Sequence, residues 1–262
     1  MSGELIVRRF GAIGARVALY ALDGAGVRLN IDRDRHGEFF VIGSGPLVDL
    51  RVVDARPEMR HLLLHAVRTR SGERDRYVCG HDERHWFVAA VPDVRGVGGV
   101  STALEALKPE AVRQRQERAG VRGRDRMLRR TAAYVRQGEW FFVPRPEFSG
   151  TGVEIHRDEP LSRGAGSKPH WVDELVRFGG QTVYVSRLAP TGLTEGKYRE
   201  LLRSSSEART AQWQIRTRGA TVLVRGRVRH PDHATIRLGF WHEVIMNTEW
   251  QAPAMRDVAF LD

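Results

Sequence analysis

Two short segments of the chain combine histidine with acidic residues, which are the side chains that bind metals and move protons. Residues 81–85 read His-Asp-Glu-Arg-His, and residues 229–233 read Arg-His-Pro-Asp-His. Imidazole and carboxylate groups ligate divalent metals, and a histidine beside a carboxylate can act as a general base. The candidate catalytic residues and candidate ligands of a divalent metal are therefore His81, His85, His230 and His233. Tight charged turns between strands are the simpler interpretation of both segments.

Other motifs that would indicate a particular reaction are incomplete. The order of residues 81–85 differs from the HExxH metalloprotease pattern. His233-Ala234-Thr235 has the His-x-Thr form of two-histidine phosphoesterases, but the sequence holds no second copy. The glycine-rich segment 164–170 fails the Walker pattern because Pro169 follows Lys168. Lys168 remains a candidate phosphate contact, because we expect a helix to begin just after it and helix N-termini favour anions.

Arginine dominates the charge of the chain. The 262 residues carry 42 Lys+Arg against 32 Asp+Glu, and three of the basic residues are lysine, which leaves 39 arginines and a net charge of +10. The planar arginine fork binds phosphate and carboxylate bidentately. A GC-rich genome would explain arginine in place of lysine, but it would not explain the positive total. The composition therefore indicates a polyanionic partner.

The positive charge is concentrated in residues 93–138, which hold 11 basic and 5 acidic side chains. The spacing of Met127, Leu128 and Val135 predicts a helix from Asp125 that ends at Gly138, with arginines on its exposed face. Such a surface would bind phosphate backbones through charge. A solvated face, or pairing with acids elsewhere, is the alternative. The candidate phosphate contacts are Arg122, Arg124, Arg126, Arg129 and Arg130.

A second row of arginines lies on the hairpin predicted over residues 221–246. Strand alternation places Arg225, Arg227 and Arg229 on one face, and a three-residue turn would put Arg227 opposite Arg237. Opposed like charges need an anion between them. The row is therefore a second candidate nucleic-acid contact. A carboxylate of the protein itself is the simpler candidate for that anion.

The arrangement of apolar runs and turn residues predicts an α+β fold. We expect antiparallel sheets in the N- and C-terminal parts and an arginine-rich helical segment between them. The predicted parts are a β-rich region over 1–92, the basic helical segment over 93–138, and an α+β region over 139–262. Shorter predictions are a strand over 5–7, a loop over 145–170, and helices over 171–178 and 195–203.

The remaining composition indicates an ordinary globular protein. No apolar run reaches the roughly 20 residues of a membrane span, and the first residues lack a signal-peptide pattern. We therefore expect a cytoplasmic protein with no membrane partner. Cys79 is the single cysteine, which excludes an internal disulfide and predicts a buried thiol.

Three functions are consistent with these residues. The first is binding of RNA or DNA with low sequence specificity, with RNA favoured because no helix-turn-helix pattern is evident. The second is a metal-dependent phosphodiesterase or nuclease that uses the histidines of both segments. The third is a structural or assembly protein that binds an acidic protein partner. A shared catalytic site requires residues 81–85 and 229–233 to lie within about 15 Å of each other.

Overall fold

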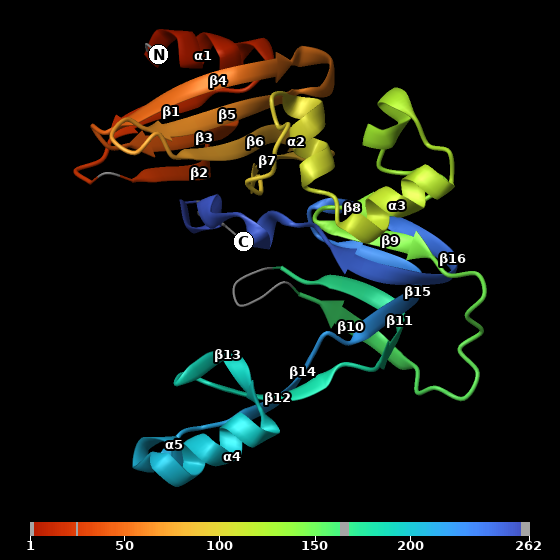
Figure 1. The fold of residues 1–262 in the computed structure, drawn as a ribbon. Helices are drawn as coiled ribbons and strands as arrows, with labels where there is room; N and C mark the ends of the chain where they lie inside the picture. The colour runs from red at the N-terminus through yellow and green to blue at the C-terminus, as the bar shows by residue number, and fades with distance from the viewer. Residues whose placement is uncertain (1–2, 25, 163–167, 258–262) are drawn as a thin grey trace.

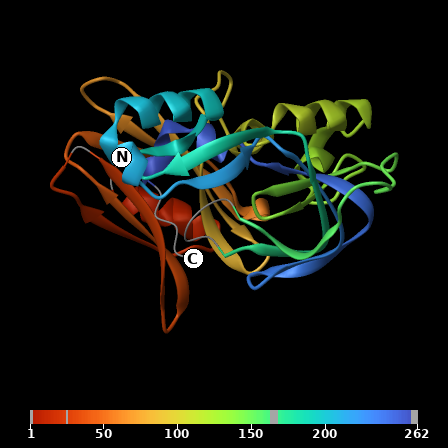
Figure 2. The same ribbon diagram turned by 90° about the horizontal axis from the view of Figure 1, so that it is seen from below.

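The computed structural model describes residues 3–24, 26–162 and 168–257, and it has a mixed α+β fold with mostly antiparallel sheets (Figures 1 and 2). The strands form four sheets, and β1 with β3 is the parallel pair among the described strands. The α+β class predicted from the sequence is confirmed at this level. No described helix is long and apolar enough to cross a membrane.

The N-terminal half forms two sheets, shown in red to orange in Figure 1. One has the order β1-β3-β2 and the other is the meander β4-β5-β6-β7. The strand predicted over 5–7 is wrong, because Ile6 and Phe10 are buried four residues apart on one face of a helix. The elements are α1 Gly3–Ala12, β1 Val17–Ala21, β2 Val27–Asp34, β3 Gly37–Ser44, β4 Val48–Arg56, η1 Pro57–Met59, β5 His61–Arg68, β6 Arg74–Asp82 and β7 His85–Ala90.

The core of these sheets includes residues from the far end of the sequence. Ala252 and Ala254 pack with Phe10, Phe40 and the other apolar side chains between the sheets. Ala252 follows the 3-10 turn η3 (Glu249–Gln251), and Ala254 lies in the 3-10 turn η4 (Pro253–Asp257). Burial also raises the pKa of the Cys79 thiol, which confirms the buried cysteine.

One buried histidine on β5 makes stability depend on pH. His65 on β5 is 6% exposed, and burial, followed by the charges of Arg74 and Arg76, lowers its pKa from 6.5 to about 4. The unfolded chain binds a proton at His65 more tightly than the folded chain does. The contribution of the neutral histidine to the free energy of unfolding is therefore fully present above pH 6.5 and is lost as the pH falls toward 4. We expect urea unfolding at pH 7 and pH 4 to show a loss of about 3 kcal/mol at most from this group. His65→Gln should flatten the dependence, and an unchanged slope would contradict the assignment.

The basic segment is less helical than predicted. It contains α2 (Val100–Ala106), α3 (Glu110–Arg118), the 3-10 turn η2 (Gly123–Met127) and β8 (Val135–Gln137). The helix predicted from Asp125 to Gly138 is therefore wrong. Tyr134 is 1% exposed, and its hydroxyl lies 3.0 and 3.1 Å from the carbonyl oxygens of Arg126 and Leu128. The Thr131 hydroxyl accepts a hydrogen bond from the amide of Ala133. These bonds hold the segment in an irregular path.

The central sheet has the order β10-β11-β15-β16-β9-β8. The helix predicted over 171–178 is wrong, since these residues form β11 in the middle of this sheet. A β-bulge between Val172 and Glu174 shifts the buried face, so buried Val172 and Leu175 are three residues apart and imitate helical spacing. The loop predicted over 145–170 contains β10. The strands are β9 Trp140–Pro144, β10 His156–Leu161, β11 His170–Phe178, β15 Thr221–His230 and β16 His233–Met246.

The predicted terminal hairpin is β15 and β16. Val228 pairs with Ile236 and Arg227 with Arg237, as the sequence predicts. The turn holds two residues in place of three because His230 pairs with His233, and the register shifts twice along the hairpin, between His230 and Val228 and between Gly226 and Val224. Val224 consequently faces His242.

A small unit extends from the central sheet at the bottom of Figure 1, in cyan. Its sheet has the order β13-β12-β14, and Tyr184 of β12 stacks on Tyr198 of α4 at a centroid distance of 4.0 Å. The helix predicted over 195–203 is confirmed as α4. The elements are β12 Gln181–Ser186, β13 Ala189–Thr194, α4 Glu195–Ser204, α5 Ser206–Thr210 and β14 Gln214–Arg218.

Candidate metal centre and active-site cleft

The two histidine-bearing turns lie against each other. The amide of Ala234 donates a hydrogen bond of 2.7 Å to Oε2 of Glu83, which is the turn residue between β6 and β7. Nε2 of His85 lies 3.9 Å from Oδ1 of Asp232, in the turn between β15 and β16. The separation limit for a shared site is therefore satisfied, although the two turns are about 150 residues apart in the sequence.

A third element brings another histidine to the β15–β16 turn. His170 is the first residue of β11, it is 2% exposed, and its ring stacks on His230 at a centroid distance of 4.2 Å. One nitrogen from each of His170, His230 and His233 lies within 4.8 Å of the other two. Sequence reasoning missed His170 because the segment after it was expected to be a helix, whereas β11 is the direct neighbour of β15.

Gly138, in the turn between β8 and β9, leaves room beside these rings. It has φ +55°, and a Cβ atom there would lie 3.1 Å from Nε2 of His233 and 3.5 Å from Nε2 of His170. Both nitrogens therefore face the same space next to the glycine. A side chain at this position would fill the space that a bound ion needs.

The three histidines suit a borderline metal such as Zn²⁺. Burial, followed by the charge of His230, lowers the pKa of His233 to about 4, so its ring is neutral at pH 7, as metal ligation requires. Nδ1 of His230 accepts the amide of Asp232 at 3.1 Å, and a metal ligated there would replace this bond. Three protein ligands leave a coordination position for water or substrate, as in catalytic zinc sites.

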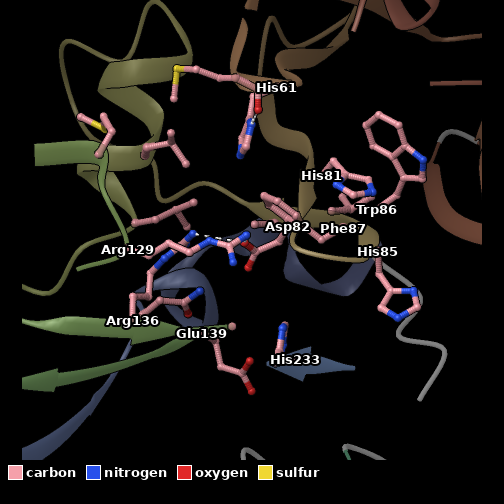
Figure 3. A pocket seen from close by; sticks show the side chains of 18 of the residues that line it. His61, His81, Asp82, His85, Trp86, Phe87, Arg129, Arg136, Glu139 and His233 are labelled. Atoms are coloured by element: carbon pink, nitrogen blue, oxygen red, sulfur yellow. Dashed lines mark hydrogen bonds and ion pairs between the residues drawn. The ribbon is translucent and has the colours of Figure 1, made fainter. Parts of the chain in front are cut away.

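The candidate ligands His81 and His85 lie outside this group of nitrogens. Nδ1 of His85 is 2.6 Å from Oε1 of Glu38 on β3. The His81 ring packs edge-on against Trp86 at 4.9 Å, and burial followed by the charge of Arg60 lowers its pKa. Both rings border the hollow shown in Figure 3, with His233 across it. Their position favours contact with a bound substrate over ligation by the same ion.

A large cleft opens onto the histidines, with a cavity volume of about 1340 Å³. The β6–β7 hairpin and its neighbours form one wall, and the turns at the end of the central sheet form the other (Figure 3). Cationic side chains line both walls and are interspersed with carboxylates. The cations are Arg33, Arg56, Lys108, Arg124, Arg129, Arg136 and Lys168.

The arginines of the hairpin row pair with carboxylates of neighbouring strands. Arg225 lies 2.6 Å from Glu174 and Arg227 lies 3.0 Å from Asp173. Arg229 lies 2.6 Å from Asp158. The protein therefore supplies the anion that the opposed arginines require, as the simpler interpretation holds. Arg237 has no ion pair within the part of the chain that the structure describes.

The arginines of the basic segment divide into two groups. Arg126 pairs with Glu105 at 2.8 Å, and Arg129 pairs with Asp82 and, at 2.5 Å, with Glu83. Lys168 precedes a strand and not a helix, so the helix N-terminus argument fails, and its Nζ pairs with Asp232 at 3.0 Å. The rest of its glycine-rich segment, 163–167, lies outside the described residues. Of the arginines predicted to contact phosphate in this segment, Arg122, Arg124 and Arg130 are exposed and have no ion pair to any described residue.

Arg129 connects the basic segment to the β6–β7 turn, so its removal should destabilise the fold. Its side chain is 34% exposed, and burial followed by the charge of Arg136 lowers its pKa to about 10. We expect Arg129→Met to lower the free energy of unfolding by about 1–3 kcal/mol, because Glu83 loses its arginine partner and Asp82 keeps only the more distant Arg136, at 3.7 Å. The neighbouring exposed Arg130→Met is the control and should change it by less than about 0.5 kcal/mol. Urea unfolding of both variants tests this, and equal effects would contradict it.

The sequence matches no family model, and neither the curated proteins nor the solved structures contain a match. Inference about function therefore rests on the geometry of the cleft.

Proposed function

We propose that the protein is a metal-dependent phosphodiesterase that acts on nucleic acid or a related phosphodiester. The observation that carries the proposal is that the start of β11 and the β15–β16 turn gather three histidines at a large cleft, next to the β6–β7 turn, and that cationic and acidic side chains both line this cleft. His170, His230 and His233 would hold the ion.

The chemistry of such a centre suits phosphate esters. A metal with an open coordination position polarises a phosphoryl oxygen and lowers the pKa of a bound water. Arg124 lines the same cleft and has no ion pair to any described residue, so it would neutralise part of the phosphate charge. A net charge of +10 would also attract a polyanionic substrate at long range.

Binding of nucleic acid without catalysis is less well supported. Four of the arginines predicted to contact phosphate on the hairpin row and at position 129 engage carboxylates of the protein. Internal pairing leaves fewer free charges for a phosphate backbone. Arg122, Arg124 and Arg130 have no ion pair to any described residue, and Arg124, which lines the cleft, would hold the substrate strand.

The test is hydrolysis of single- and double-stranded RNA and DNA and of bis(p-nitrophenyl) phosphate, with EDTA or with added Mg²⁺, Mn²⁺ or Zn²⁺. We expect cleavage with at least one metal and none in EDTA. His230→Ala should abolish it, whereas His156→Ala on β10 should not. Retention of nucleic acid without cleavage under every condition would overturn the proposal in favour of binding alone.

A further inference from the structure

Glu38 and His85 form a contact that the metal centre does not use. Oε1 of Glu38 lies 2.6 Å from Nδ1 of His85, and Oε2 accepts the Trp86 amide at 3.0 Å. Burial opposes ionisation of Glu38, but the hydrogen bonds from Arg33, Trp86 and His85 keep its pKa below the usual range. An ionised carboxylate only accepts hydrogen bonds, so Nδ1 of His85 carries a proton. In the neutral ring, Nε2 therefore has a free lone pair.

His85 lines the cleft, and its free nitrogen lies near the β15–β16 turn that carries His230 and His233. Its distance of 3.9 Å from Oδ1 of Asp232 is too long for a direct hydrogen bond. Asp232 stands between His230 and His233 in the sequence, and its other oxygen is held by Lys168. Glu38 thus fixes the His85 ring through Nδ1, and Nε2 is left without a hydrogen bond to Asp232, so that it would be available to a substrate. Its side chain is 34% exposed, so water can reach it.

We propose that Glu38 and His85 form the general base pair of the reaction, with His85 as the catalytic residue and Glu38 as a positioning residue. This inference rests on the proposed phosphodiesterase activity. Nε2 of His85 takes the proton of the attacking water as its oxygen bonds to phosphorus. The bond from phosphorus to the leaving oxygen breaks, and the leaving alkoxide takes a proton from solvent. The imidazolium that forms is stabilised by Glu38 and then releases its proton to solvent.

The charged and titratable groups around His85 come from several elements. Glu38 contributes from β3, His81 from β6, and Asp232 with its partner Lys168 from the far wall. Arg33 of β2 reaches Glu38 at 2.8 Å. The carboxylates on both sides of the ring would stabilise the imidazolium that proton transfer creates.

The experiment compares the parent, His85→Gln and Glu38→Gln, with His36→Gln as a matched control on an exposed histidine of the neighbouring turn. The substrate is bis(p-nitrophenyl) phosphate with the activating metal, and metal content is measured by mass spectrometry. We expect His85→Gln to lower kcat by about 10²- to 10⁴-fold. KM and bound metal should stay within twofold, and the acidic limb of the pH–rate profile should disappear. Glu38→Gln should lower kcat less and displace that limb.

The outcomes separate the two proposals. If the parent is active and His85→Gln behaves like His36→Gln, the base pair is overturned and the phosphodiesterase stands. If the metal-loaded parent hydrolyses nothing, both are overturned. Nitrogen-15 spectra of histidine-labelled protein give a reading that does not need activity or a variant. They should show His85 protonated at Nδ1 near neutral pH, and protonation at Nε2 alone would also overturn the pair.

Discussion

Replacing His170 with alanine is expected to lower the affinity for Zn²⁺ by at least about 100-fold, and hydrolysis with it. Loss of an outer-shell partner already costs about 10- to 100-fold in metal affinity, so loss of a direct ligand should cost more. His170 contributes one of three nitrogens that lie within 4.8 Å of one another. The remaining pair, His230 and His233, would hold the ion with two ligands only.

The measurement is calorimetric titration with Zn²⁺, supported by the thermal shift that the metal produces. A ligand that binds only the folded state raises the free energy of unfolding by about 2.7 kcal/mol when its free concentration is 100 times Kd. The Tm of the parent should therefore rise when zinc is added, and the Tm of His170→Ala should not. His36→Ala, on an exposed histidine far from the triad in sequence, is the control. One zinc ion bound with parent affinity by His170→Ala would contradict the assigned centre.

Gly138→Ala is expected to weaken metal binding by at least about tenfold, since its methyl group would lie 3.1 Å from Nε2 of His233. The glycine also has φ +55°, so alanine adds a backbone cost of about 1–2 kcal/mol. Gly120→Ala separates the two effects. Gly120 has φ +67° and no atom within 4 Å of the added Cβ among the described residues.

Both alanine variants should lose similar stability in urea, and only Gly138→Ala should lose affinity for zinc in calorimetry. Equal affinities in the two variants would show that the space beside Gly138 is not needed by an ion.

The sequence predicted the turns of the site better than the elements between them. Residues 81–85 and 230–233 were placed in turns from strand alternation, and the structure has turns there. Period-2 alternation is read locally, so neither turn required knowledge of the fold. Their meeting is a long-range contact made by the Ala234 amide and Glu83, and no local pattern contains it.

The wrong predictions have local physical causes. The bulge after Val172 gives β11 a helical spacing of buried residues, and that error concealed His170. After Arg126, the Tyr134 hydroxyl is hydrogen-bonded to the carbonyl oxygens of Arg126 and Leu128, in place of the backbone bonds of a helix. The spacing of apolar residues alone does not reveal these contacts. The partners of Arg225 and Arg227, Glu174 and Asp173, come from a strand some 50 residues earlier, so the sequence left both a phosphate and a carboxylate of the protein open as the anion of this row.

The packing of Ala252 and Ala254 into the first core has a consequence for biosynthesis. Ala252 and Ala254 join a core whose other buried members lie within residues 6–90, so that core is complete only once residue 254 has been synthesised. Contacts of such long sequence separation close slowly and leave apolar surface open to aggregation in the meantime. The N-terminal sheets would therefore reach their final packing only after the histidines of β15 and β16 had been synthesised.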